Sequence, residues 1–310
     1  MFNLDSANFY GEPTLEDYIE KNVISFLNYG FLEMGAFYNV PTGTLNYLGR
    51  DGSLLRPIIN VPHITGYTHY VGFKNDWVWE TGISFKYQGG SQPTTPTGIY
   101  VDSVYYPTGT NVGGVSYYID YNQGAVVFDS PLAPSRIVQV PHALRGITIQ
   151  PLDSYEYRTL DNVWQTYNPS ASGINVTMQQ LHLPAICVGL DGYSSKGMEI
   201  GSRNKYSQAK LRFEIFSSNP TELKKICDAL YMLESKEIDF FDIKKCPRPL
   251  NYKGERVSGH VDYKWATQNY LLNKGLFKDG IKVIKIRDSM LPIYRARVFA
   301  DLENIVNIVQ

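Results

Sequence analysis

The sequence is poor in cysteine and in charge. Its 310 residues contain three cysteines, an odd number without close spacing: Cys187, Cys227 and Cys246. This pattern argues against a disulfide framework, so we expect free thiols and assembly in a reducing cytosol. Charged residues make up 19% of the chain, whereas aromatic residues reach 14%, led by 24 tyrosines. Tyrosine suits both strands and subunit interfaces, and composition alone does not separate the two uses.

Long apolar runs are also absent. No stretch approaches the roughly 18 uninterrupted apolar residues of a membrane span, and residues 1–10 lack the apolar segment of a signal peptide. We therefore expect no membrane partner and no secretion. The chain is longer than one hydrophobic core usually organises, so we expect two domains with an additional arm or insertion.

The sequence signatures of the common enzyme classes are missing. There is no GxGxxG, GxxxxGK[ST], GxSxG, HExxH or EF-hand pattern. This predicts a protein that is not an enzyme and that uses no cofactor. No fixed-period repeat is present, which argues against solenoids and propellers.

Histidine and cysteine offer only weak metal candidates. His63 and His69 lie six residues apart, a spacing that matches none of the usual zinc pairs. The side chains that would complete such a site are His142, His182 and Asp76. A second set is Cys227, Cys246 and His260. Cys227 falls near the apolar stripe of a predicted helix, where a small hydrophobic side chain is the ordinary explanation, so we predict no metal site.

The net charge of −1 hides an uneven distribution of charge along the chain. Residues 1–200 carry 9 Lys+Arg against 17 Asp+Glu, whereas residues 201–310 carry 20 against 13. Such asymmetry is typical of nucleic-acid contact by the basic part, or of stacked subunits in which acidic and basic parts meet. Solvated lysines on polar loops would give the same numbers.

Two segments carry helix signals. Residues 13–30 begin with Thr14 as a cap and place apolar residues on one face: Leu15, Ile19, Val23 and Phe26. Residues 219–234 begin with Asn219 as a cap, followed by proline at the first helical position. The apolar face of this second helix is Leu223, Ile226, Leu230 and Leu233. Each face needs a partner.

Strand signals dominate the rest of the chain. Residues 67–87 alternate large apolar and polar side chains, and residues 98–149 have turns about every ten residues, which is typical of an antiparallel sandwich or barrel. In the second segment a turn at residues 122–124 closes a hairpin, with Gly124 supplying a positive φ. Further strands are predicted at 174–188, 209–217, 237–243, 281–289 and 292–304. We predict loops at the glycine-rich residues 189–201 and at the basic stretch 244–279.

These elements predict an α+β, β-rich fold class. A small antiparallel β-sandwich or barrel module stands beside a domain in which a helix covers a sheet. We expect residues 1–97 to form an N-terminal helix and β arm that pack on the C-terminal domain. Residues 98–149 form the all-β module, and residues 150–310 form the helix-on-sheet domain.

Two groups of side chains are candidates for contacts. The basic stretch carries Lys244, Lys245, Arg248, Lys253, Arg256 and Lys264, interleaved with aromatic residues. Such a stretch suits phosphates read without sequence preference, although a solvated loop between subunits is the simpler explanation. The aromatic pair Trp77 and Trp79, with Glu80, is similar to sugar-binding chemistry, but burial or a subunit interface explains it more simply.

Three stretches together resemble virion structural proteins of tailed bacteriophages. They are VISFLNYGFLEMGAFYNV with NDWVWETGI, GIYVDSVYYPTGT with YYIDYNQGAVVFDSPL, and the closing LPIYRARV. The C-terminal part, FEIFSSNPTELKKICDALYMLESKEIDFFDI with YRARVFADLE, also resembles the tail-terminator fold. In that family a helix packs on a sheet, and subunits close a ring on top of the tail tube. The module 98–149 and the N-terminal helix exceed what a simple terminator needs.

The resemblance implies a structural subunit of a virion. It would form a homo-oligomeric ring, a hexamer, at the neck or head-to-tail interface, as a tail terminator or connector. Its partners would be other neck and tail proteins, with non-specific contact to packaged DNA, and it would assemble in the host bacterial cytoplasm. A baseplate, tail-tube or sheath-associated role is one alternative. The other is a carbohydrate-binding or depolymerising tail protein working through Trp77, Trp79 and Glu80.

Overall fold

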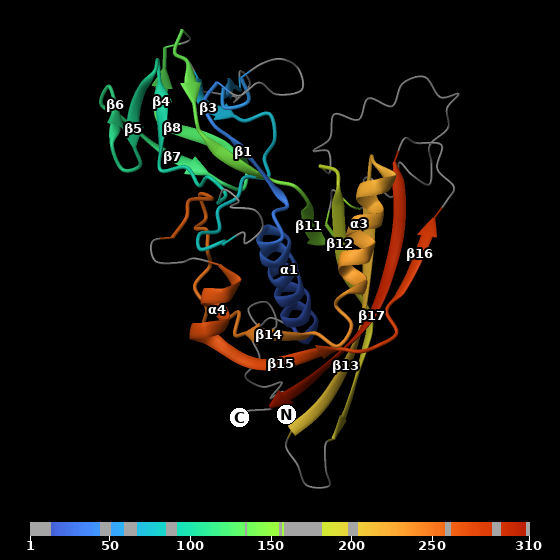
Figure 1. Cartoon of the computed structure of the whole chain (residues 1–310). Coiled ribbons are helices and arrows are strands. Elements are labelled where there is room, and N and C mark those ends of the chain that lie inside the picture. The colour runs from blue at the N-terminus through green and yellow to red at the C-terminus, as the bar shows by residue number, and fades with distance from the viewer. Residues whose placement is uncertain are drawn as a thin grey trace. The chain divides into compact units, whose positions relative to one another are not determined.

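The computed structural model of the chain forms two compact units (Figure 1). Unit 1 comprises residues 1–28, 147–247 and 263–310, and unit 2 comprises residues 29–146 and 248–262. Each unit therefore combines segments that lie far apart in the sequence. The structure describes residues 14–43, 51–58, 67–84, 92–133, 135–154, 157, 182–197, 204–257, 262–286 and 293–307.

A seven-stranded sheet is the framework of unit 1. Its strands follow the order β11-β12-β13-β17-β15-β14, and β16 also pairs with β17. The β11–β12 pair is parallel and the other pairs are antiparallel. The bounds are β11 (Thr148–Pro151), β12 (Ala185–Gly197), β13 (Asn204–Ser217), β14 (Glu237–Phe241), β15 (Leu271–Phe277), β16 (Lys282–Ile286) and β17 (Tyr294–Asn307).

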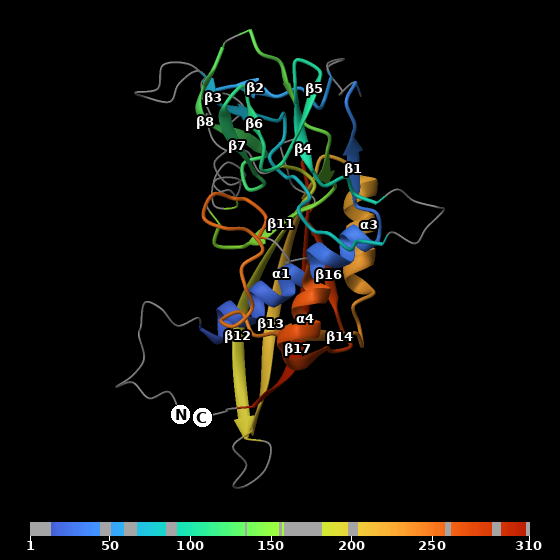
Figure 2. The ribbon, with the colours of Figure 1, turned by 90° about the vertical axis from the view of Figure 1, so that its left-hand side faces the viewer.

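Helix α3 (Pro220–Tyr231) covers one face of this sheet, against β13, β16 and β17 (Figures 1 and 2). The Asn219 side chain accepts a hydrogen bond from the Thr221 amide at 2.9 Å, and Pro220 occupies the first position. The buried face consists of Leu223, Ile226, Cys227 and Leu230. The predicted helix and its cap are thus confirmed, but the helix ends at Tyr231, so Leu233 of the predicted apolar face lies beyond it.

Helix α1 (Leu15–Glu33) also begins as the sequence predicts. The Asp17 amide donates to the Thr14 hydroxyl at 3.1 Å, and the Thr14 amide donates to the Asp17 carboxylate at 2.8 Å. This reciprocal pair satisfies two amides that the first turn would otherwise leave unpaired. The helix belongs to unit 1 as far as Asn28.

The two central strands of the sheet separate apolar from charged side chains. On one face Leu211, Phe213 and Ile215 of β13 stand opposite buried residues of β17, namely Ala300, Val298 and Ala296. On the other face the buried Glu214 lies opposite Arg297. Its carboxylate accepts from Arg295 Nε at 3.0 Å and from Arg297. This arrangement keeps a buried charge paired, as stability requires.

Unit 2 contains three smaller sheets. Their orders are β2-β3-β8-β7-β6, β5-β4-β9 and β1-β10, with antiparallel pairing throughout. Side chains of the first two sheets share one core, for example Ile119 and Phe128 with Ile99 and Val138. The bounds are β1 (Phe37–Val40), β2 (Arg56–Pro57), β3 (Tyr67–Val71), β4 (Gly98–Val101), β5 (Val104–Pro107), β6 (Asn111–Val112), β7 (Val115–Asp120), β8 (Ala125–Leu132), β9 (Val138–Gln139) and β10 (His142–Arg145).

The α+β, β-rich fold class is therefore confirmed, with an antiparallel module and a sheet covered by a helix. The predicted hairpin turn joins β7 to β8, and Gly124 has a φ of 56°. A side chain at Gly124 would also meet the backbone of Asn75 at 2.6 Å, so both conformation and space require glycine there.

Two segments predicted as loops form regular structure instead. Strand β12 runs through the glycine-rich residues to Gly197, and a bulge between Leu190 and Gly192 absorbs the extra residue. The basic stretch contains α4 (Tyr263–Tyr270) and β15. Strand β15 was not predicted because Gly275 is a residue that usually interrupts strands. A side chain at this position would lie 2.6 Å from the Phe240 ring, so glycine is required here.

The predicted strand at 67–87 is shorter than expected. Only β3 forms in its first part, and Trp77 makes a single isolated bridge with Leu144. Residues 85–87 lie outside the described part of the chain, as do residues 174–181 of another predicted strand. The segment around Trp77 is therefore not a continuous strand: Trp77, Val78 and Glu80 are buried and Trp79 is half-buried.

The compact units group residues differently from the boundaries predicted at 97/98 and 149/150. Strand β3, from the predicted N-terminal arm, pairs with β8 of the predicted module, so both lie in unit 2. Unit 1 contains 20 Lys+Arg and 21 Asp+Glu, and unit 2 contains nine of each. The charge asymmetry along the sequence is therefore nearly cancelled within each unit.

Candidate interaction surfaces

One outer edge of the unit 1 sheet, that of β14, is closed by side chains. The Asn22 side chain of α1 accepts from the Phe241 amide at 2.8 Å and donates to the Phe241 carbonyl at 3.2 Å. The Tyr263 hydroxyl accepts from the Asp239 amide at 3.1 Å and donates to the Asp239 carbonyl at 2.6 Å. Both backbone groups of alternate residues are thus occupied, which prevents another strand from pairing there.

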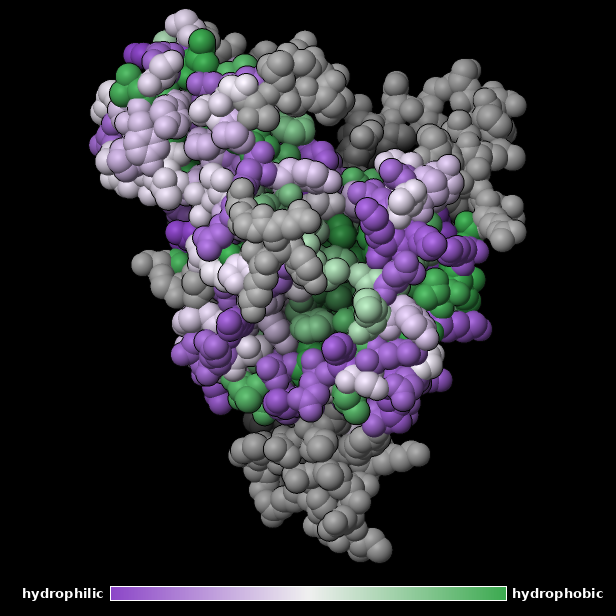
Figure 3. All heavy atoms as spheres, viewed as in Figure 1, coloured by the Kyte–Doolittle hydropathy of each residue, from purple (hydrophilic) through white to green (hydrophobic). Residues whose placement is uncertain are grey.

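The edge of β16 is different. Among the described residues, β16 pairs with β17 alone, through Val283 opposite Val298 and Ile284 opposite Arg297. Lys282, Ile284 and Lys285 are exposed. Figure 3 shows hydrophobic side chains over β16 among hydrophilic ones. Within the described part of the chain, no strand pairs with the outer backbone groups of this edge, which could therefore accept another strand.

A groove runs beside this open edge. It has a volume of about 600 Å³ and lies between α3 and β16. Its lining residues are Cys227, Asp228, Tyr231, Val283, Ile284 and Lys285. Burial raises the pKa of the Cys227 thiol, so this cysteine serves as a small apolar wall.

A second apolar surface lies on the outer face of the β14–β15 ladder. Leu272 and Leu276 are 46% and 41% exposed, on either side of Lys274 along β15. Lys274 forms ion pairs across the ladder with Glu237 at 3.0 Å and Asp239 at 3.7 Å. Two leucines are therefore exposed to solvent on either side of Lys274, whose charge is already paired. The alternation in LLNKGLF is the sequence signal that was missed, because Gly275 interrupts it.

The basic residues predicted as contacts are divided between the units. Lys244 and Lys245 are exposed in a turn after β14, where the Asp242 carboxylate accepts from the Lys244 amide at 3.0 Å and pairs with Lys245 at 3.4 Å. Lys264 is exposed on α4. These three belong to unit 1.

The other three basic residues belong to unit 2, in an ordered segment rather than a free loop. Arg248 and Arg256 are exposed. Lys253 is half-buried, with its ammonium 5.0 Å from the centre of the Tyr118 ring. The Tyr121 amide donates to the Gly254 carbonyl at 3.0 Å, which ties the segment to the end of β7. Contact with DNA through the six basic residues remains a prediction.

The tryptophan pair divides between core and surface. Trp77 is 1% exposed and stacks on His142, with ring centres 4.3 Å apart, so it presents no face to a sugar. Trp79 is half-buried beneath Arg145. Glu80 is buried and binds the Arg145 guanidinium with both oxygens, at 2.7 and 2.6 Å. Both Trp77 and Glu80 thus serve the interior of unit 2.

The candidate metal ligands do not gather. No group of three or more histidine, cysteine or acidic side chains suited to a metal exists among the described residues. Burial lowers the pKa of His142 to about 4, and its Nδ1 lies 2.8 Å from the Val140 carbonyl. The three cysteines are free, as predicted, and all three are buried. His63 and His260 lie outside the described residues.

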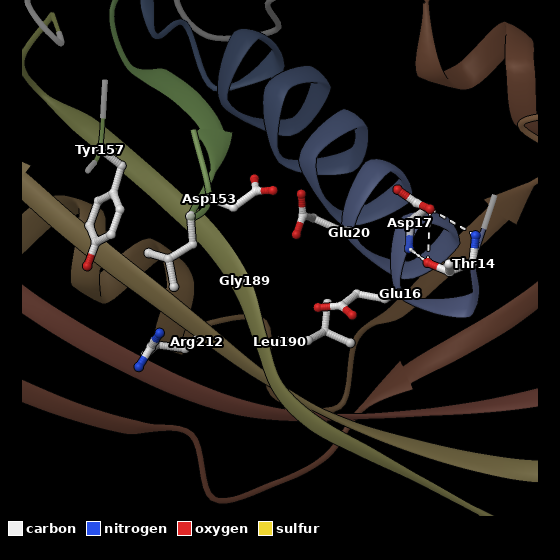
Figure 4. Close-up of a pocket in the computed structure, with 10 residues that line it drawn as sticks. Thr14, Glu16, Asp17, Glu20, Asp153, Tyr157, Gly189, Leu190 and Arg212 are labelled. Atoms are coloured by element: carbon white, nitrogen blue, oxygen red, sulfur yellow. Dashed lines mark hydrogen bonds between the residues drawn. The ribbon is translucent and has the colours of Figure 1, made fainter. Parts of the chain in front are cut away.

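An acidic cavity of about 540 Å³ lies at the start of α1 (Figure 4). Glu20 and Asp153 point toward each other across it. Burial raises the pKa of Glu20 to about 7, and the neighbouring carboxylates of Asp153, Glu16 and Asp17 add to the effect. Glu20 therefore holds its proton close to neutral pH.

No helix in the described ranges is long and apolar enough to cross a membrane. No protein-family model matches the sequence, and no curated protein matches it. The interpretation of the surfaces consequently rests on the residues themselves.

Proposed function

We propose that this chain is a structural subunit that assembles with copies of itself into a ring, at the neck or head-to-tail interface of a tailed bacteriophage. The observation that carries the assembly part is the pair of exposed leucines on β15, Leu272 and Leu276. Exposed apolar side chains that gather on one regular face are typical of protein interfaces.

The energetics favour covering this face. Full burial of a leucine side chain contributes about 1.5–3 kcal/mol, so leaving both leucines in water forgoes a large part of the stabilisation that an interface would provide. Because Lys274 is already paired with Glu237 and Asp239, burying it costs less than burying an unpaired lysine. When this face meets a different surface of the next copy, a ring forms provided that the rotation between neighbouring copies closes.

The phage part of the proposal is supported by the resemblance of the sequence to virion structural proteins and to the tail-terminator fold. In unit 1 a capped helix lies on a sheet that is antiparallel except for the β11–β12 pair, an arrangement that supports this part of the proposal. The cancelled charge of unit 1 removes the asymmetry argument for DNA contact, so the leucine face and the resemblance are the support that remains.

The assembly part is tested with the double variant Leu272→Thr, Leu276→Thr. Threonine retains strand propensity while removing apolar area. Light scattering during size-exclusion chromatography should show a wild-type oligomer and a dissociated variant, and negative-stain microscopy should show rings only for the wild type. Val104→Thr, on the exposed strand β5, is the matched control and should remain oligomeric.

A wild-type monomer at the highest soluble concentration would overturn the assembly proposal. The phage part is tested by mass spectrometry and antibody labelling of purified virions. We expect the chain at the neck; its absence from virions would refute that position, and a position at the baseplate would favour the alternative structural role.

A further inference from the structure

We infer that the edge of β16 and the groove beside α3 bind an extended segment of a partner protein by strand addition, and that this segment carries both apolar and acidic residues. The first step is the contrast between the edges of one sheet. The β14 edge is closed by Asn22 and Tyr263, whereas β16 pairs with β17 alone among the described residues. An added strand obtains its affinity from backbone hydrogen bonds along such an edge.

The groove supplies the second step. One face of an added strand would point its alternate side chains toward α3, where Tyr231 is 50% exposed and Cys227 and Val283 form the floor of the groove. Ile284 follows Val283 along the strand and pairs with Arg297, so its side chain lies on the opposite face. Apolar side chains of the partner segment would fill this space, because alternate residues of a strand lie on one face.

The third observation is the charge of the β16 edge, which indicates the kind of partner segment that binds there. Lys282 and Lys285 are exposed, and neither forms an ion pair with another described residue. Two lysines on an open edge repel strands of like charge and attract acidic ones. A second copy of β16 would bring four lysines together, so the charge favours an acidic segment from a different protein.

This site is separate from the leucine face of β15, so the inference does not depend on self-assembly. The probe is a fluorescent peptide of about eight residues of glutamate and valine, long enough to span β16. Its glutamates are three positions apart, because Lys282 and Lys285 lie three positions apart on opposite faces of β16. Fluorescence anisotropy with the full chain should show saturable binding. The same peptide with N-methyl groups on the amides of one edge should lose at least about tenfold in affinity, since those amides no longer donate.

Charge reversal provides the decisive variant. Lys282→Glu, Lys285→Glu should weaken binding of the glutamate peptide about tenfold or more and should gain binding of a lysine–valine peptide. Lys244→Glu, Lys245→Glu makes the same charge change elsewhere on unit 1 and should leave both affinities unchanged. Circular dichroism checks that each variant keeps its strand content.

Three results would overturn the inference. They are no binding of the glutamate peptide to the wild type, equal binding to the charge-reversed variant, and unchanged affinity after N-methylation. A wild-type oligomer that Ile284→Lys dissociates, while Leu272→Thr, Leu276→Thr leaves it intact, would also overturn it, because that result assigns the edge to a second copy. Failure of the leucine variants alone bears only on self-assembly.

Discussion

The β14 and β16 strands end the same sheet on the same side of β17, yet their edges are treated in opposite ways. At β14, a helix from the start of the chain and a tyrosine from α4 occupy the outward backbone groups. At β16, two lysines flank an exposed isoleucine, and the backbone has no strand partner beyond β17 among the described residues. One edge is closed by hydrogen bonds and the other is guarded only by charge.

The two edges of unit 1 therefore differ in which added strands they exclude. Hydrogen-bond capping excludes every strand, whereas lysines exclude basic or neutral strands more strongly than acidic ones. A sheet whose β14 edge is closed at Asp239 and Phe241, and whose β16 edge on the same side of β17 is selective, is suited to accepting one kind of strand at one defined place.

The largest expected effect comes from opening the closed edge at Asn22. Its side chain is fully buried and also donates to the Tyr18 carbonyl at 2.8 Å. Asn22→Ala leaves the amide and carbonyl of Phe241 without partners, which should lower the free energy of unfolding by about 2–4 kcal/mol. Urea unfolding measures this change.

Asn269 provides the matched control, because its side chain also bonds the carbonyl four residues earlier but is exposed and lies on α4. Asn269→Ala should change the free energy of unfolding by less than about 0.5 kcal/mol. Equal effects of the two variants would contradict the role of Asn22 in closing the edge.

A smaller effect is expected at Tyr263. Tyr263→Phe keeps the ring, which packs on Phe26 with centres 5.7 Å apart, and removes only the hydroxyl. The free energy of unfolding should fall by about 1–2 kcal/mol. Hydrogen exchange at the Asp239 amide should accelerate, while Tyr294→Phe, at an exposed site on β17, should leave it unchanged. An Asp239 amide that exchanges as slowly as before would show that the hydroxyl does not close the edge.

The smallest predicted effect is a pH dependence of the stability of the fold near the β14 edge. Glu20 lies on α1 near Asn22, and its pKa is raised from 4.5 to about 7. Because the folded state holds this proton more tightly, the stabilisation is complete below pH 4.5 and is lost as pH rises through 7. Glu20→Gln should therefore raise the melting temperature by about 2–4 °C at pH 8, the shift that about 1 kcal/mol gives.

At pH 4 the Glu20→Gln variant and the wild type should melt together, since both side chains are then neutral. The same pH series should show faster exchange at the Phe241 amide above pH 7 in the wild type only, after correction for intrinsic exchange. A constant difference between the two proteins at every pH would contradict titration of Glu20 as the cause.

Local signals were enough to predict part of this fold. The cap at Asn219 with Pro220, the pair Thr14 and Asp17, and the turn at Gly124 each involve residues a few positions apart, so their chemistry can be read from short windows. Strands β14, β16 and β17 also showed clear alternation or β-branched runs.

What could not be predicted depends on contacts between distant residues. Gly275 reads as a strand breaker, but the Phe240 ring on the neighbouring strand requires it. The burial of Trp77 was one of two explanations that the sequence left open, and only the stacking on the distant His142 decides between them. The edges of β14 and β16 look alike in sequence, because the side chain that closes one of them comes from 219 residues away.

The interleaving of the two units has a consequence for synthesis. The central strand β17 follows the other described elements in the sequence, and residues 248–262 complete unit 2. During translation, unit 2 cannot close its full set of contacts until residue 262 has left the ribosome, and unit 1 cannot do so until β17 has. At a synthesis rate of about 5–20 residues per second, β17 is synthesised several seconds after β12 and β13. Folding of unit 1 is thus a late event, and the open edges of its strands are exposed to other chains before the sheet is complete.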